Sequence, residues 1–334
     1  MIGSRTRRGA LLLAGLLLAG CGGEGGDPVR VTIPEGSGMA AASDSLAARG
    51  VIRWPAGFRL YARMRGAERS LKPGVYEIPQ GSTWGAALDK LVSGDVVQVR
   101  VTIPEGWTAR QIAARLAEVT GTPVDSVLAL VADTAAAQTW SVPGPTLEGY
   151  LYPATYEFAL GTPPRRMVRA MVDRYRKAWT PAMRARADSL GMSEREVVAL
   201  ASIVEKEAKV WTERDTISAV YHNRLRIGMR LQADPTVQYA LGAHQSRLLY
   251  SHIDSVAGNP YNTYRRAGLP PGPIASPSRG SIEAALNPAK VDYLYFVARP
   301  NGTHVFTRSL ADHNRAKRSS QRERAAAQTS AGNR

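Results

Sequence analysis

Residues 29–36 and residues 99–106 are the same eight, VRVTIPEG, and VYEIPQG at 75–81 is a related stretch. In each copy apolar and polar residues alternate, which is typical of a strand with one buried face. The Ile-Pro-x-Gly end then stops the strand, and apolar residues at helical spacing follow the copies at 75–81 and 99–106. The sequence therefore predicts short strand–turn–helix units and a fold of the α+β class.

These units make up a predicted N-terminal module of residues 28–120, which a connector at 121–145 joins to a second region. Repeated local units usually serve the fold alone. The small α/β shape of the module also resembles glycan-binding modules of the LysM kind. Two interpretations therefore stay open for it, a structural one and a glycan-binding one.

The net charge of the 334-residue chain is +15, from 43 Lys and Arg against 28 Asp and Glu. A charge of this size suits nucleic acid, anionic lipid or an acidic polymer, and it does not choose among them. The single cysteine excludes an internal disulfide, and the five histidines lack the spacing of a zinc site. We therefore expect no metal site and no cofactor.

The first 21 residues, MIGSRTRRGALLLAGLLLAGC, indicate where the chain works. Three arginines precede an apolar run at 10–20, which is too short to cross a bilayer comfortably and is typical of a signal peptide. The run ends in LAGC at 18–21, which resembles a bacterial lipobox and predicts a lipid on Cys21; an uncleaved anchor is the alternative. Residues 22–27 then form a tether. The rest is expected outside the cytoplasm, held at a membrane (the inner one is favoured) and away from nucleic acid.

The second region, residues 146–314, shows clear helical patterns. Apolar residues share one face of an expected helix at 165–179. A capping box of Ser193 and Glu196 opens the next helix, and a third helical pattern spans 214–225. This region is therefore expected to be mixed α and β, with several amphipathic helices.

The C-terminal end combines a hairpin signal with a basic segment. Two apolar stretches flank Asn301-Gly302, which predicts a β-hairpin around a type I′ turn. Residues 315–334 carry six basic residues against one acidic residue and have little to bury. We expect this segment to be a disordered, solvated tail.

Residues 197–208, VVALASIVEKEA, form an apolar helix that ends in two carboxylates. With residues placed 100° apart, Glu205 falls on one edge of the apolar face and Glu207 on the other, while Lys206 points away. Periodicity therefore does not decide which glutamate matters, and both are consistent with ordinary boundary residues.

Several segments of residues 146–314 form a recognisable set, namely LEGYLYPATYEF at 147–158, LASIVEKEA at 200–208, NRLRIGMRLQADPTVQYALG at 223–242, YNTY at 261–264, GLPPGPI at 268–274 and ALNPAKVDYLYFVA at 285–298. In their order and spacing they resemble the catalytic domain of the endolytic murein transglycosylase family (MltG, or YceG-like). The N-terminal module resembles the LysM-like region of that family. Two departures stand out: Ala154 replaces a usual aspartate, which puts a substrate contact or loop bond in question, and a lipid anchor replaces the membrane-spanning helix of many members.

The resemblance implies a periplasm-facing lyase that cuts peptidoglycan glycan strands internally between MurNAc and GlcNAc and leaves 1,6-anhydroMurNAc ends. It implies that Glu205, the first glutamate of the SIVEKE segment, is the acid/base residue. Such a residue must be protonated near neutral pH, which apolar neighbours such as Ala201 and Val204 favour. The expected partners are nascent glycan strands and the peptidoglycan synthesis machinery. Two rivals remain, a muramidase that uses water and a non-catalytic wall-binding scaffold.

Other polar residues of the second region are candidates for substrate binding. Glu148 is expected to bind the sugar or to anchor a loop. Asp234 is expected to contact the sugar or to cap a helix whose first position is Pro235. The remaining candidates, whose aromatic faces, amides and hydroxyls suit sugar rings as well as an ordinary loop, are Gln232, Thr236, Tyr261, Asn262, Thr263 and Tyr264.

Overall fold

The computed structural model describes residues 26–332, with side chains to residue 325. The expected leader at 1–21, with the proposed lipid site Cys21, lies outside these residues, as does most of the tether. Contacts divide the chain into two compact units, residues 1–100 with 157–162 (unit 1) and residues 101–156 with 163–334 (unit 2). Residues 101–120, which the sequence analysis assigns to the N-terminal module, thus belong to unit 2.

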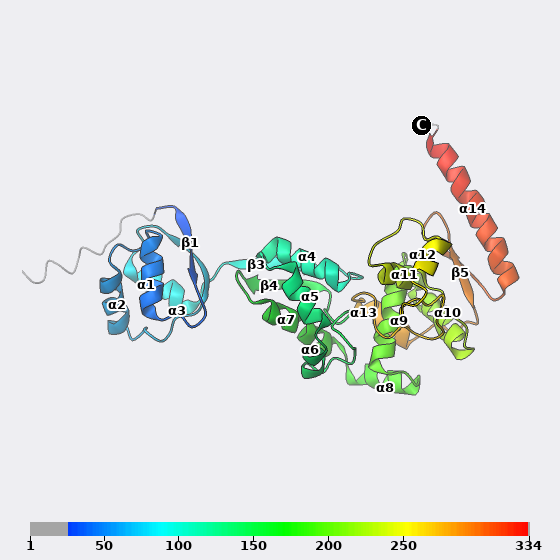
Figure 1. The fold of residues 1–334 in the computed structure, drawn as a ribbon, viewed down its shortest axis with the longest axis horizontal. Helices are drawn as coiled ribbons and strands as arrows, with labels where there is room; N and C mark the ends of the chain where they lie inside the picture. Colours follow the sequence, from blue (N-terminus) through cyan, green and yellow to red (C-terminus); the bar gives the residue numbers. More distant parts are fainter. Residues whose placement is uncertain (1–25, 333–334) are drawn as a thin grey trace, which may run out of the picture. The chain divides into compact units, whose positions relative to one another are not determined.

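Unit 1 follows the order strand–helix–helix–strand–helix (Figure 1): β1 (Pro28–Ile33), α1 (Met39–Ala48), α2 (Pro55–Met64), β2 (Gly74–Pro79) and α3 (Trp84–Ser93). Strands β1 and β2 are antiparallel, with Val31 opposite Tyr76. Alternate strand residues are buried in one core with Leu46 and Phe58. The expected strand–turn–helix units are confirmed here, whereas a LysM-like character stays a prediction.

The second copy of VRVTIPEG forms β3 (Gln98–Ile103), which pairs with β4 (Ala154–Ala159). The hydroxyls of Thr102 and Thr155 lie 3.0 Å apart across this pair. Ala154 begins β4, so the residue that departs from the family pattern stands at a strand end.

The helices of unit 2 make most of the mixed α+β fold. The expected helix at 165–179 is confirmed as α7, and the one at 214–225 as α10. Besides the parts of β3 and β4 that belong to it, unit 2 contains α4 (Ala109–Thr120), α5 (Val124–Ala132), α6 (Thr134–Thr139), α7 (Pro164–Ala178), α8 (Pro181–Ser189), α9 (Glu194–Glu207), η1 (Trp211–Glu213), α10 (Arg214–Arg226), α11 (Asp234–Leu241), α12 (Tyr250–Ser255), α13 (Arg279–Leu286), β5 (Tyr295–Ala298), β6 (His304–Thr307) and α14 (Leu310–Gly332).

Helix α9 is the central element of unit 2 and carries both candidate glutamates. Its N-terminus has the expected capping box, in which Ser193 and Glu196 each accept a bond from the other's backbone N–H. Eight successive residues, 197–204, are buried against α8, α10, α11 and α13. A helix buried on all sides over two turns is held in place by packing. The last turn therefore has a fixed position for Glu205 and Glu207.

The expected hairpin is present as β5 and β6, but the type I′ turn is wrong. Such a turn needs positive φ at both central residues. Here Gly302 has a φ of 87°, and Asn301 is not among the described non-glycine residues with positive φ. The Gly302 N–H instead bonds the Arg299 carbonyl (3.1 Å), which centres the turn on Pro300-Asn301. Proline fixes φ near −65°, which favours a type I turn at this place.

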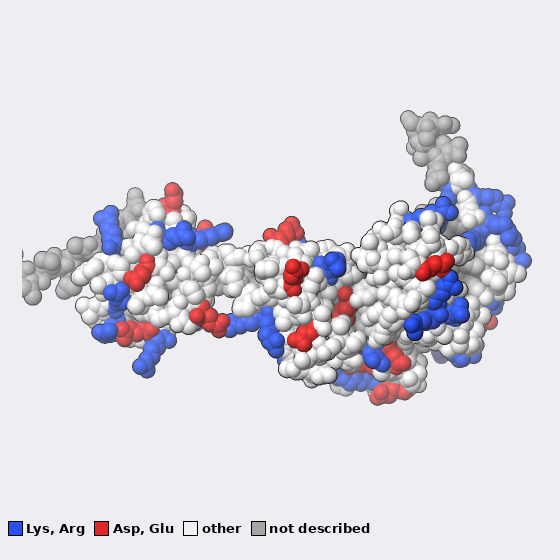
Figure 2. Space-filling view, in the orientation of Figure 1, with Lys and Arg blue, Asp and Glu red and all other residues white. Residues whose placement is uncertain are grey.

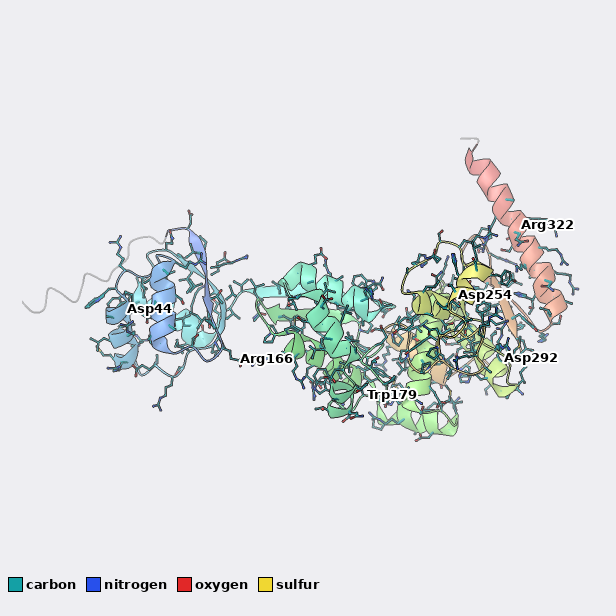
Figure 3. The ribbon with its side chains drawn as sticks, in the orientation of Figure 1. Asp44, Arg166, Trp179, Asp254, Asp292 and Arg322 are labelled. Atoms are coloured by element: carbon teal, nitrogen blue, oxygen red, sulfur yellow. The ribbon has the colours of Figure 1, made fainter. Side chains whose placement is uncertain are left out.

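The expected disorder of residues 315–334 is also wrong, because α14 continues through this segment to Gly332. The Ser309 hydroxyl accepts a bond from the Asp312 N–H (3.1 Å) at the helix start. Further along, the Ser320 hydroxyl and the Arg324 guanidinium both bond the Ala298 carbonyl at the end of β5. Capping and docking on the hairpin stabilise a helix that composition alone does not indicate. Arg322 projects from it (Figure 3).

Within residues 26–332, no helix is both long enough and apolar enough to span a bilayer. The same part of the chain holds no group of three or more His, Cys, Asp or Glu arranged to bind a metal ion.

Candidate functional site

Unit 2 contains a cleft of about 910 Å³. It lies between the first turn of α4, helix α5, the end of α9 and helix α11, and its wall carries three carboxyl groups, those of Glu148, Glu207 and Asp234. Glu205 is not among the described residues that line it. A concave site with convergent acidic groups is suited to bind a polar ligand and to transfer protons to it.

Glu207 ends α9 and reaches the cleft from a partly buried position. The Tyr221 hydroxyl donates a hydrogen bond to its Oε1 atom (3.1 Å). Burial, and then the negative charge of Asp234, raise the pKa of Glu207 to about 7, against the lowering effects of the Tyr221 bond and of Arg224. A carboxyl group with this pKa is substantially protonated at neutral pH, as a general acid requires.

Asp234 is the first residue of α11 and faces the same cleft. The Tyr264 hydroxyl donates to its Oδ1 atom at 2.5 Å. The expected helix cap is wrong, since Ala233 takes the N-cap position and no side chain caps this helix. Asp234 is instead engaged by Tyr264, and its charge makes proton loss from Glu207 less favourable.

Glu148 is buried (7% exposed) and lies where α4 begins. The Ala109 N–H at the first position of α4 donates to both carboxyl oxygens, at 3.0 and 3.2 Å. Burial raises the pKa of Glu148 to about 7, although the N–H groups of Ala109 and Gly149 and the Tyr239 hydroxyl lower it. These bonds agree with the expectation that Glu148 anchors a loop. Its carboxyl group also lines the cleft.

The pKa of Glu148 makes a pH-dependent contribution to stability. Because the folded pKa of about 7 lies above the ordinary 4.5, folding favours the protonated form. The contribution is full below about pH 4.5 and is lost as the pH rises to about 7, by roughly 3 kcal/mol. We expect Glu148→Gln to flatten the fall in the free energy of unfolding across this pH window, as measured by urea unfolding.

A matched control for this measurement is Glu118→Gln, which changes an exposed glutamate paired with Arg115 on α4. It should keep the wild-type pH dependence. An unchanged slope in Glu148→Gln would show that the pKa of Glu148 is the same in the folded and the unfolded chain.

Glu205 lies in a different environment from the apolar one expected for it. Its carboxylate accepts bonds from the Ser278 N–H (3.0 Å), the Ser278 hydroxyl (2.5 Å) and the Ser281 hydroxyl (2.6 Å). It also pairs with Arg214 at 3.1 Å, and the two side chains are only 7% and 10% exposed. The four donors join the end of α9 to the start of α10 and the N-terminus of α13. This pattern is typical of a structural ion pair.

The Pro-Glu-Gly turn after β3 packs against the same end of α9. The Gly106 N–H bonds the Ser276 carbonyl (2.8 Å), and the Lys206 ammonium bonds the Gly106 carbonyl (3.2 Å). Gly106 has a φ of 71°, and a Cβ there would lie 3.4 Å from the side chain of Glu205. The second copy of the repeat therefore helps to fix the last turn of α9, in addition to forming a strand.

Three of the sugar-contact candidates are buried and hold a loop in place. Thr236, Asn262 and Thr263 are 0%, 0% and 1% exposed. The two threonine hydroxyls lie 2.8 Å apart, and the Asn262 amide donates to two carbonyls of the preceding segment, at 2.9 and 3.1 Å. Their side chains thus serve the loop that carries Tyr261 and Tyr264.

The other candidates lie at or near the cleft surface in different ways. The ring of Tyr261 lies 4.8 Å from that of Tyr239, whose hydroxyl contacts Glu148 at 3.5 Å. Gln232 is exposed, has a φ of 48° and is not among the described lining residues. Glu148 and Asp234 thus line the cleft, and Tyr261 and Tyr264 contact its lining residues Tyr239 and Asp234 without being among the described lining residues themselves.

Glu207 and Tyr239 line the cleft, although the sequence analysis set Glu207 beside Glu205 without choosing it and did not name Tyr239. The helical pattern indicated only that Glu205 and Glu207 each lie on an edge of the apolar face. Tyr239 lies five residues after Asp234 on the same short helix, so a search for further aromatic residues on α11 would have found it.

Comparisons with known proteins agree on one family. A family model described as the YceG-like family matches residues 31–319. A Bacillus subtilis protein named endolytic murein transglycosylase is 35% identical over 305 residues, which cover 86% of this chain and 84% of that protein. A Streptococcus pneumoniae protein of the same name is 31% identical, and the match covers 57% of its length.

A solved structure gives the same result. The 2.6 Å crystal structure of a putative YceG-like protein from Listeria monocytogenes is 34% identical, with a TM-score of 0.60, and the match covers 86% of this chain and 98% of that one. With the match to the family model over most of its length, the chain belongs to the YceG-like family.

Proposed function

We propose that this chain is an endolytic murein transglycosylase, a lyase that cuts the glycan strands of peptidoglycan between MurNAc and GlcNAc. Its relatives from Bacillus subtilis and Streptococcus pneumoniae bear this name. The single observation that carries the mechanism is Glu207, a carboxyl group with a pKa of about 7 in the wall of the cleft. No cofactor and no metal enter the proposed reaction.

The reaction needs one residue that first gives a proton and then takes one. Glu207 donates its proton to the glycosidic oxygen as the bond to C1 of the muramyl residue breaks, and the GlcNAc-bearing strand leaves with that proton. The resulting carboxylate then accepts the proton of the muramyl 6-hydroxyl, whose oxygen bonds to C1. The product is a 1,6-anhydro ring, water is not consumed, and Glu207 ends protonated as it began.

The choice of Glu207 over Glu205 rests on their surroundings. Glu205 is ion-paired with Arg214, accepts three further hydrogen bonds and is not among the described residues that line the cleft. Glu207 lines the cleft, and its burial and the neighbouring Asp234 raise its pKa to about 7, although the bond from the Tyr221 hydroxyl lowers it. The structure therefore favours Glu207 for the role that the family resemblance gave to Glu205.

A hydrolase that cuts the same bond with water is the second candidate, because Glu148 puts another carboxyl group with a pKa near 7 in the cleft. Hydrolases use two carboxyl groups, one as acid and one to activate water or attack the sugar. The backbone N–H groups that hold Glu148 at the start of α4 favour a positioning role instead.

Mass spectrometry of the fragments released from purified sacculi tests the proposal. We expect muramyl ends that are lighter than reducing ends by one water, which is the mark of the anhydro ring. Reducing ends would establish the hydrolase, and the absence of any shortened strand would leave a wall-binding scaffold.

For its location, we propose the cell envelope, with the chain held at a membrane through the apolar segment at 10–20 and a lipid on Cys21. Unit 1, with its small strand–helix–helix–strand core, is then a candidate for holding glycan near the catalytic unit. Nascent strands close to the peptidoglycan synthesis machinery would be the substrate. The net charge of +15 supports engagement of a polymer that carries carboxylates.

A further inference from the structure

Helix α2 of unit 1 carries large apolar side chains that face solvent. Trp54, Leu60 and Met64 are 62%, 55% and 74% exposed. At helical spacing Leu60 and Met64 are neighbours one turn apart, and Trp54 stands at the N-cap of the helix. With the half-buried Tyr61 and Trp84, these residues are named the α2 patch here.

A glycine lets the aromatic rings of the α2 patch lie close to the helix. A Cβ at Gly57 would lie 2.4 Å from the ring of Trp54 and 2.6 Å from that of Trp84. The two indoles are 6.2 Å apart, and Tyr61 lies 5.9 Å from Trp84. The rings of Trp54, Tyr61 and Trp84 thus pack on one another along the helix that carries Leu60 and Met64.

The segment around the α2 patch is strongly basic. Residues 49–72 contain seven Lys and Arg and only one acidic residue, Glu68. Arg53, Arg63 and Arg65 are exposed next to the apolar side chains. Figure 2 shows several Lys and Arg side chains projecting from unit 1 on the face in view. Three of these arginines pair with surface carboxylates, Arg59 with Asp44, Arg63 with Glu68 and Arg65 with Asp89, which leaves four of the seven positive charges in excess.

We propose that the α2 patch docks unit 1 onto an anionic lipid bilayer, with Trp54, Leu60 and Met64 inserted at the level of the headgroups. Tryptophan favours this interface, aliphatic side chains gain from the acyl region, and a rim of arginines pairs with lipid phosphates. A glycan would use the aromatic faces but would gain little from Leu60 and Met64, because its surface is covered with hydroxyls.

The proposal rests on the membrane location proposed above, and the length of the tether supports it. The chain from position 21 to Pro28, where β1 begins, spans at most about 25 Å when fully extended. If the segment before it is held in the membrane, unit 1 stays within this distance of the lipid surface. A weak apolar contact is then sufficient, because the effective concentration of the surface is high.

Co-sedimentation with vesicles tests the proposal on the chain from Gly22 to Arg334, which keeps both compact units and lacks the apolar leader. The vesicles contain phosphatidylglycerol and phosphatidylcholine in about equal parts, or phosphatidylcholine alone. We expect binding to the anionic vesicles that weakens from about 0.1 M to about 1 M salt. Leu60→Gln with Met64→Gln should weaken it by about tenfold or more.

The matched control is Ile227→Gln with Leu249→Gln, two exposed apolar residues of unit 2 at 53% and 45% exposure. It should bind vesicles like the wild type. Arg53→Gln should cost about fivefold on anionic vesicles only. Thermal melts check folding, and Met64→Gln alone repeats the test if the double variant melts early, since Met64 has the largest exposed fraction of the three.

The outcomes separate this proposal from the proposed function. Equal vesicle binding by the wild type and the Leu60/Met64 variant overturns the docking proposal. If the variant also binds sacculi more weakly than the wild type, the α2 patch is a glycan-binding surface. The release of muramyl ends from soluble glycan strands should be the same in the variant and the wild type. A chain that binds vesicles as expected but cuts no glycan would leave the docking surface standing and remove the enzyme.

Discussion

Glu207→Gln is expected to lower the rate at which the chain releases 1,6-anhydromuramyl ends by about 10²–10⁴-fold or more, with the fold retained. Glutamine keeps the shape of the side chain and still accepts the bond from the Tyr221 hydroxyl, which lies 3.1 Å from Glu207. It has no acidic proton for the glycosidic oxygen and no carboxylate for the muramyl hydroxyl. Both proton transfers fail together, because one residue performs both. Mass spectrometry of timed digests of sacculi measures the loss.

The pH dependence of kcat/KM is a second test of Glu207 as the general acid. The pKa of Glu207 is raised to about 7 by burial and by Asp234. Since the protonated form is the active one, kcat/KM in the wild type should fall by about tenfold per pH unit above about pH 7. Glu148→Gln should keep this fall, although Glu148 has a similar pKa of about 7.

A second variant tests the alternative assignment, in which Glu205 and not Glu207 is the acid. Glu205→Gln combined with Arg214→Met removes the buried ion pair without leaving a lone charge, and it leaves Glu207 untouched. We expect this double variant to retain most of the activity. The double variant could instead be folded but inactive, while Glu207→Gln still releases anhydro ends. In that case Glu205 is the proton donor, as the family resemblance implies.

Several strands and helices of this protein could be predicted from the sequence, because local residue patterns determine them. Alternating residues in VRVTIPEG predicted β1 and β3, and Ser193 with Glu196 predicted the start of α9. Each of these features depends on residues a few positions apart.

The difference between the surroundings of Glu205 and Glu207 could not be predicted from such patterns. A period of 3.6 residues puts Glu205 and Glu207 on equivalent edges of one face, so their difference comes from other parts of the chain. Ser278 and Ser281 lie more than 70 positions after Glu205, and only the fold brings them to it. The same holds for the tail, since α14 is supported by Ala298 at the end of β5.

Glu205→Gln alone is expected to lower the free energy of unfolding of unit 2 by about 3–5 kcal/mol, because it leaves the buried Arg214 without its counter-ion. Arg214 is 8% exposed, its guanidinium lies 4.1 Å from the centre of the Trp211 ring, and its Nε and Nη1 atoms have no hydrogen-bond partner among the described residues. Glu205 is therefore the main compensation for a charge that water does not reach. Urea unfolding, followed by circular dichroism, measures the loss.

Adding Arg214→Met to Glu205→Gln should restore most of this stability, since a methionine of similar length needs no counter-ion and can keep the contact with the exposed Trp211 ring. The amide introduced by Glu205→Gln would still accept bonds from Ser278 and Ser281, so the N-terminus of α13 should stay joined to α9. The double-mutant cycle then gives a coupling energy of several kcal/mol between the two positions. Additive losses would mean that Glu205 and Arg214 do not stabilise the fold as a pair, and Glu205 would then return as a candidate for the acid. A strong coupling together with retained activity identifies Glu205 as the residue that positions the last turn of α9, and with it the carboxyl group of Glu207.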